Sequence, residues 1–128
     1  MNLRNRKFVR TIQIILGLYL VFITIAGVFQ LLPPPAFNEA GMAFLTAIFA
    51  TGYLTYLMQF IFFICGLMFI FNKWSAFGAV LLAPITVNIL AFHIFLDFMG
   101  WWMALIFAIL NAYLIIIHWP RYKMIFAK

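Results

Sequence analysis

Charged residues are so widely spaced in this chain that they divide it into long uncharged stretches. No charged side chain occurs in residues 11–38, between Arg10 and Glu39, or in residues 40–72, between Glu39 and Lys73. Residues 74–96 and 98–120, on either side of Asp97, are uncharged as well. A helix needs about 20 residues to cross the hydrocarbon core of a bilayer. The spacing therefore predicts four membrane-spanning helices.

Composition supports this prediction and excludes a soluble domain. Hydrophobic residues make up 69% of the chain and charged residues 8%, against about 45–50% and about 25% in soluble proteins. We therefore predict an all-α integral membrane protein, a four-transmembrane-helix bundle that forms a single membrane domain over residues 1–128, with the lipid bilayer as its first partner. Nucleic acid is not an expected partner, because the bases lie at the ends of spans and form no basic face. The predicted spans are residues 11–32, 51–71, 75–96 and 98–119.

The positions of the bases predict how the chain is oriented. With four spans, every base falls on one side of the membrane, and both acids fall on the other. The bases are Arg4, Arg6, Lys7, Arg10, Lys73, Arg121, Lys123 and Lys128. Because cytoplasmic loops of membrane proteins are enriched in Lys and Arg, we expect both termini to be cytoplasmic.

The uncharged stretch that precedes Lys73 is too long for a single span and predicts an additional element. Pro33, Pro34 and Pro35 are expected to end the first span, because proline supplies no amide donor. Asn38 followed by Glu39 is typical of a helix start, with a capping side chain and an acid in the first turn. We predict a short interfacial helix over residues 38–50, lying on or in the outer leaflet. An early start of the second span is the alternative.

Each predicted span carries one stripe of small or polar residues at a spacing of about seven, which places them on one face of a helix. Such residues face other helices rather than lipid. The stripes could serve only as contacts between helices, or they could form a site. The stripe residues are Gln13, Gly17 and Thr24 in the first span, Gly52, Gln59 and Gly66 in the second, Thr86, His93 and Asp97 in the third, and Asn111 and His118 in the fourth.

The candidate site lies in the outer half of the bundle and centres on His93. Its other candidate members are Asn88, Gln59, Asp97 and Thr24, with Asn111 near mid-membrane. Asp97 lies four residues after His93, which is the spacing of a proton relay or a hydrogen-bonded pair. The rival interpretation is that His93 only bonds Gln59 or a backbone carbonyl. Asn88 and His93 are about 140° apart around the helix, so we expect them to face different neighbours.

Three further expectations qualify this site. If it binds a ligand, His93 should open on a cavity of about 300 Å³ or more. A metal is not expected, because the second histidine usual for a transition-metal site is missing. Pro84 leaves the carbonyl of Val80 without its helical partner and kinks the span, either to line a cavity or only to pack.

Two further residues are expected to lie outside this site. Cys65 is the single cysteine and should be a packing residue, and His118 should be an interfacial or C-terminal capping residue.

The third span also carries a recognisable motif, Leu82-Ala-Pro-Ile-Thr-Val-Asn-Ile-Leu-Ala-Phe-His93. This run resembles the signature of the DoxX family of small four-span bacterial membrane proteins. The resemblance extends over nearly the whole chain, through Gly17, Gly52-Tyr53, Gly66-Leu67 and Arg121-Tyr122-Lys123. It implies a bacterial inner membrane and an association with quinone-, thiol- or sulfur-linked redox systems. Family members often carry a carboxylate one turn before the position of Gly66, where this chain has Phe62.

Three functions are consistent with these features. The first is an accessory or partner subunit of a larger membrane complex, redox-linked by the resemblance, which would not be an enzyme on its own. Its partners would be other membrane-protein subunits or further copies in a homo-oligomer, and it would hold no intrinsic cofactor. The second is a quinone- or lipid-binding protein with its site around His93. The third is an oligomeric small-molecule transporter.

Overall fold

The computed structural model describes residues 4–33 and 36–127, and every regular element within these ranges is helical. The expected all-α class is therefore confirmed. The longer helices are α1 (Arg6–Val28), α2 (Glu39–Ala50), α3 (Leu54–Ile70), α4 (Ser75–Phe95) and α5 (Trp101–Ile117). The shorter elements are η1 (Phe98–Gly100), α6 (Trp119–Tyr122) and η2 (Lys123–Ile125).

Three segments of the described chain are each long and apolar enough to cross a membrane: α1, α4 and the continuous stretch Phe98–Ile117. The pair α2 and α3 passes the same test only when taken together, and these two helices meet at an angle of 91°. The chain thus has three candidate spans, or four if the bent pair provides one. These apolar helices indicate a helical membrane protein.

Helix α1 is shifted toward the N-terminus relative to the predicted span 11–32. It begins at Arg6 because the Asn5 side chain accepts a hydrogen bond from the Lys7 amide at 2.9 Å, which caps the helix. It ends at Val28 because Gln30 adopts a left-handed conformation, with φ of 54°. The expectation that the prolines end this helix was wrong, since Pro33 lies beyond that turn and residues 34–35 are outside the described part of the chain.

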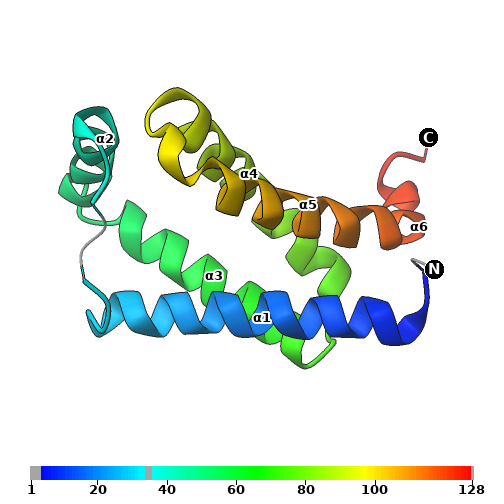
Figure 1. Ribbon diagram of the computed structural model, residues 1–128. Helices are drawn as coiled ribbons and strands as arrows, with labels where there is room; N and C mark the ends of the chain where they lie inside the picture. The colour runs from blue at the N-terminus through cyan, green and yellow to red at the C-terminus, as the bar shows by residue number, and fades with distance from the viewer. Residues whose placement is uncertain (1–3, 34–35, 128) are drawn as a thin grey trace.

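The short helix predicted before the second span is confirmed as α2. The Asn38 side chain accepts a hydrogen bond from the Gly41 amide at 2.8 Å, and Glu39 lies in the first turn. Figure 1 shows α2 turned away from α3 at one end of the molecule. Gly52 has φ of 80° between the two helices, and a Cβ atom there would meet nothing within 4 Å. Gly52 is therefore a turn residue, and its assignment to a packing stripe was wrong.

The other two glycines of the predicted stripes do bring helices together. A Cβ atom placed on Gly17 would lie 2.8 Å from the backbone oxygen of Gly66, and one placed on Gly66 would lie 3.0 Å from the oxygen of Gly17. Helices α1 and α3 therefore pack backbone to backbone, as predicted. Helix α4 packs between α3 and α5, whereas α1 and α5 touch only in part. The largest fully buried apolar side chains are Phe69, Leu16, Leu20, Leu82 and Leu114.

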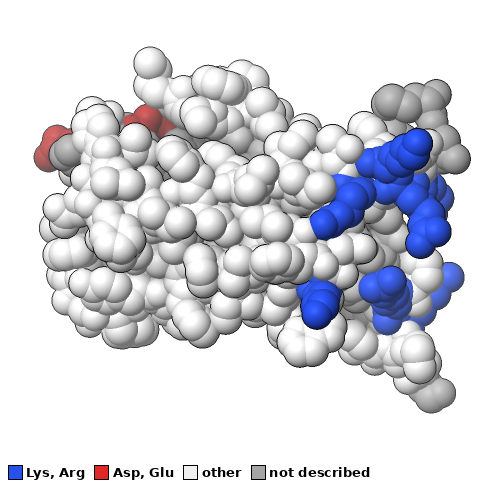
Figure 2. Space-filling view, turned by 90° about the horizontal axis from the view of Figure 1, so that it is seen from below, with Lys and Arg blue, Asp and Glu red and all other residues white. Residues whose placement is uncertain are grey.

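The described charges are separated along the bundle. Figure 2 shows Lys and Arg gathered at one end and the two acids at the other. We call these the basic end and the acidic end. The start of α1 and helix α6 lie at the basic end, whereas α2 lies at the acidic end (Figure 1).

Candidate functional site

A cavity of about 210 Å³ lies near the acidic end, between α2, α3, α4 and the residue that precedes the cap of α2. Its walls include the aromatic rings of Phe37, Phe44 and Phe92, with centroids 5.0 Å apart for Phe37 and Phe92 and 5.6 Å for Phe44 and Phe92. Asn88 and His93 are its polar lining residues. The cavity is smaller than the sequence-based expectation of about 300 Å³. Phe44, Leu45 and Ile48 of α2 form part of its wall, and the expected volume is not reached.

The His93 ring is fixed in one orientation by its surroundings. Its Nδ1 atom lies 3.0 Å from the backbone oxygen of Asp97. Because a carbonyl oxygen can only accept, Nδ1 carries the proton, and Nε2 of the neutral ring is an acceptor. Gly100 leaves room for the ring, since a Cβ atom there would lie 2.6 Å from its Cε1 atom. The Nε2 atom has no hydrogen-bond partner within residues 4–33 and 36–127.

Asn88 is the second polar group of the cavity, and its amide also makes no hydrogen bond to the described residues. The expectation that Asn88 and His93 face different neighbours was wrong. Residues of α2, α3 and α4, together with Phe37, line this cavity, so it reaches both side chains despite their different angles on the helix. Asn88 is exposed and His93 is partly buried. Within the described residues no fully buried side-chain polar atom lacks a partner, so the unbonded atoms of Asn88 and His93 are accessible from outside the protein.

His93 bonds the backbone oxygen of Asp97 and not its carboxylate, so a bond to a backbone carbonyl, the rival interpretation, is the one that the structure shows. The Asp97 carboxylate has other partners. It is buried and accepts hydrogen bonds from the backbone amides of Asn38 at 2.8 Å and Met99 at 3.1 Å. The Asn38 side chain also donates to the Leu96 oxygen at 2.6 Å. A proton relay from His93 to the Asp97 carboxylate is therefore contradicted. Asp97 instead fastens the start of α2 to the end of α4, which holds one wall of the cavity in place.

The remaining candidate residues lie away from the cavity and act within the bundle. The Thr24 hydroxyl donates to the Leu20 oxygen at 2.8 Å, and the Asn111 amide donates across to the Ala79 oxygen of α4 at 3.0 Å. Gln59 faces α1, because its Nε2 atom is the nearest group to a Cβ atom placed on Gly27, at 3.1 Å. These side chains are contacts within and between helices. They are not ligands for a molecule beside His93.

The structure also bears on the expectations for His118, Cys65 and Pro84. Nδ1 of His118 bonds the Leu114 oxygen at 2.7 Å just after α5, so the capping role is confirmed. Cys65 is completely buried and its thiol contacts the Gly78 oxygen at 3.4 Å, which confirms it as a packing residue. Helix α4 continues through Pro84 from Ser75 to Phe95.

A polar cluster at the basic end was not predicted from the sequence. The Arg10 guanidinium donates to the backbone oxygens of Phe69, at 2.6 Å, and Ile70. The Gln13 amide donates to the side chains of Asn72, at 2.9 Å, and Ser75, at 2.6 Å. The signal available in the sequence was Arg10 followed three residues later by Gln13 on one helix face. Their partners lie far along the chain, between the end of α3 and the start of α4, and could not be read from that spacing.

Tyr122 extends the polar cluster to the C-terminal segment. Its hydroxyl donates to the Ala76 oxygen, which fastens α6 to the start of α4. Burial raises the pKa of Tyr122 above its ordinary value, and the positive charge of Arg121 offsets part of this increase.

Comparisons of the chain with known protein families, curated proteins and solved structures found no match. The resemblance to the DoxX family therefore stays a prediction. In the part of the chain that the structure describes, no three His, Cys, Asp or Glu side chains are grouped in a way that could hold a metal ion. Of the six predicted site residues, His93 and Asn88 line the cavity beside α2, and the other four do not.

Proposed function

We propose that this protein is a DoxX-like inner-membrane protein that binds a quinone in the cavity beside His93 and Asn88. In this proposal α1, α3, α4 and α5 are four spans, and α2 is interfacial. The basic end lies in the cytoplasm of a bacterium, since Lys and Arg are enriched on that side of membrane proteins. The separation of bases from acids in Figure 2 supports this orientation. The cavity then lies in the outer half of the bundle.

The observation that carries the proposal is that Asn88, which is exposed, and His93, which is partly buried, line one largely apolar cavity. The Asn88 amide and the His93 Nε2 atom make no hydrogen bond to the described residues. A quinone ring has carbonyl oxygens that accept hydrogen bonds, and its reduced form has hydroxyl groups that donate them. The Asn88 amide can donate to a carbonyl. The neutral His93 ring can accept from a hydroxyl of the reduced form at Nε2, and the protonated ring can donate there.

The size and walls of the cavity also fit a single ring better than a larger molecule. A volume of about 210 Å³ equals the space of roughly seven water molecules at about 30 Å³ each. The rings of Phe37, Phe44 and Phe92 provide aromatic surfaces for offset or edge-to-face contact with a flat ligand. A long isoprenoid tail would remain in the surrounding lipid, where it needs no protein contact.

The proposal is tested by titrating the protein in lipid nanodiscs with a short-chain benzoquinone. Asn88→Leu and His93→Gln should each weaken binding about fivefold or more, the effect of losing one hydrogen bond. Gln59→Leu is the matched control, because it removes an amide from the same half of the bundle but outside the cavity. Unchanged affinity in both cavity variants would exclude this site.

The hypothesis of an accessory subunit is tested on protein purified in mild detergent, without reconstitution into nanodiscs. Native mass spectrometry of this protein should show a bound quinone. A stoichiometric protein partner without quinone would favour the accessory subunit instead.

A further inference from the structure

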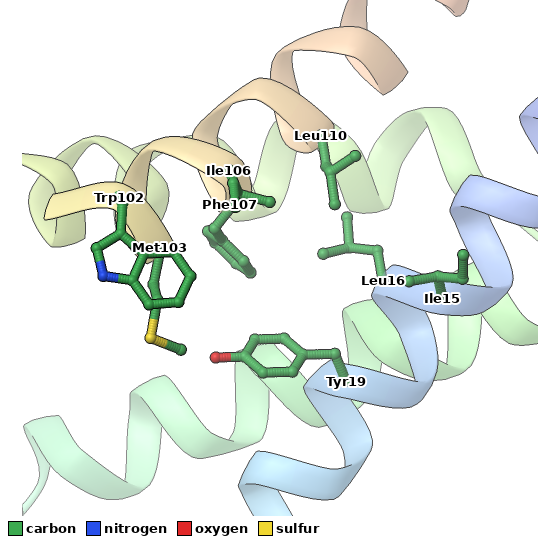
Figure 3. A pocket seen from close by; sticks show the side chains of 8 residues that line it. All are labelled: Ile15, Leu16, Tyr19, Trp102, Met103, Ile106, Phe107 and Leu110. Atoms are coloured by element: carbon green, nitrogen blue, oxygen red, sulfur yellow. The ribbon is translucent and has the colours of Figure 1, made fainter. Parts of the chain in front are cut away.

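A second cavity, of about 240 Å³, opens between α1 and α5. Figure 3 shows its lining side chains, which include Leu16 and Tyr19 of α1 and Trp102, Met103 and Ile106 of α5. Apart from the Tyr19 hydroxyl and the Trp102 indole nitrogen, the lining is apolar. We call this cavity the α1–α5 cleft. It is separate from the His93 cavity, with which it shares no lining residue.

The cleft exists because these two helices belong to different packed pairs. Helix α1 packs on α3 and α5 packs on α4, whereas α1 and α5 diverge (Figure 1). The Tyr19 and Phe107 rings still meet, with centroids 6.2 Å apart. Ile106 and Trp102 remain 51% and 54% exposed. Since both helices are candidate spans, the open side of the cleft faces hydrocarbon.

The size of the cleft selects the kind of molecule that can fill it. One turn of a helix about 10 Å wide with a pitch of 5.4 Å occupies about 400 Å³, which exceeds the whole cleft. The interior of the cleft therefore cannot hold a whole helix. A single hydrocarbon chain is narrow, flexible and apolar, and it matches the lining.

The Tyr19 hydroxyl gives the cleft one polar feature. It points across the cleft toward Met103, close to the start of α5 (Figure 3), and it makes no hydrogen bond to the described residues. Trp102 lies at the same end, and tryptophan is typical of membrane interfaces. The ester carbonyl of a phospholipid is an acceptor that joins the acyl chain to the headgroup. It could accept from Tyr19 while the chain runs along Leu16.

The charges at that end indicate the kind of headgroup. Helix α5 begins at the acidic end (Figure 1), where Asp97 is buried and Glu39 is exposed. The exposed charge at that end is therefore negative, which disfavours an anionic headgroup. We propose that the α1–α5 cleft is a binding site for one acyl chain of a zwitterionic phospholipid, whose ester carbonyl accepts a hydrogen bond from Tyr19.

The test uses a phosphatidylethanolamine with a photoactivatable diazirine in one acyl chain, in vesicles that contain the full-length protein. After irradiation, mass spectrometry should find the label concentrated on Ile106 and Leu110, which line the cleft, relative to Ile109, a lipid-exposed residue of α5 that lines neither cavity. The same diazirine chain on phosphatidylglycerol should label these residues more weakly. Equal labelling of Ile106 and Ile109 would overturn the proposal, and equal labelling by both lipids would overturn the headgroup assignment.

Matched variants distinguish an acyl chain bound in the cleft from bilayer lipid that contacts the protein without binding. Ile106→Trp fills the cleft and should reduce labelling of Leu110 to the level of Ile109, whereas Ile109→Trp should leave it unchanged. Tyr19→Phe should lower the retention of the labelled lipid about fivefold, the effect of one lost hydrogen bond. If Ile106→Trp leaves the labelling of Leu110 unchanged, no chain occupies the cleft. Because the labelling pattern of the unmodified protein is itself a test, the proposal can be refuted even if a variant fails to fold.

Discussion

The two ends of the bundle differ in how fully their polar side chains are bonded. At the basic end, Arg10 and Gln13 of α1 bond the turn between α3 and α4, and Tyr122 bonds the start of α4. Near the acidic end, the start of α2 is bonded to the end of α4, but Asn88 and the Nε2 atom of His93 have no partners within the described residues, and a cavity opens beside them. Both ends therefore hold helices together, and the acidic end also leaves polar atoms unbonded at a cavity.

The largest effect is expected where the helices of the bundle come closest. Gly17→Leu should destabilise the protein by about 3 kcal/mol or more, because overpacking a tight contact shifts the backbone. A Cβ atom at this position would already lie 2.8 Å from the Gly66 oxygen. Gly27→Leu is the control, because a Cβ atom there meets only the flexible Gln59 side chain. Unfolding in detergent with increasing dodecyl sulfate measures both, and equal losses of stability would contradict the close packing of α1 on α3.

The next largest effect should follow from removing the charged donor at the basic end. Arg10→Leu leaves the oxygens of Phe69 and Ile70 without their donor and should cost about 2 kcal/mol in the free energy of unfolding. Arg6→Leu removes the same charge from an exposed position and should cost much less. If the two variants lose equal stability, the basic end is not held together by this contact.

A smaller and more local effect is expected where α2 meets α4. Asn38→Ala removes the cap of α2 and the bond to the Leu96 oxygen, which together contribute about 1–2 kcal/mol. Amide hydrogen exchange should become faster in α2 while α1 and α3 stay protected. Glu39→Gln is the control, since its side chain makes none of these bonds. Unchanged exchange in the Asn38 variant would show that α2 is held by apolar contacts alone.

The smallest effect concerns pH and the basic end. Because the folded protein raises the pKa of Tyr122, the folded state favours the neutral phenol. Its contribution to stability is complete below the ordinary tyrosine pKa of about 10 and is lost as pH rises through the higher folded value. The stability of the unmodified protein should therefore fall more steeply above pH 10 than that of Tyr122→Phe. Tyr53→Phe, at an exposed position, should behave like the unmodified protein.

Features of the fold that depend on local sequence could be predicted, and those that depend on distant pairs could not. The cap at Asn38 and the helix after it follow from adjacent residues. The inward faces of Gly17 and Gly66 follow from helix periodicity. The pairing of Asp97 with Asn38 joins residues 59 positions apart, so the nearer His93 was assigned as its partner instead. The turn at Gly52 looked like part of a stripe because spacing alone does not show where a helix begins.

Only part of the candidate site was predictable, namely two of its six residues, and its shape was not. His93 and Asn88 were identified because a polar side chain in a membrane span needs a partner or a function. Their shared cavity also has walls from α2, which lies at 91° to α3, and sequence periodicity carries no information about that angle. The α1–α5 cleft depends in the same way on how two helices diverge.

The central claim is that the unpartnered groups near the acidic end receive a quinone, and one labelling measurement tests it directly. A photoactivatable short-chain quinone should be added to the unmodified protein in nanodiscs and its attachment sites mapped by mass spectrometry. The expected result is label on α2 and on α4 around Phe92, removed by an excess of unlabelled quinone. Label spread evenly over the lipid-exposed helices, or label that excess quinone does not displace, would contradict the claim.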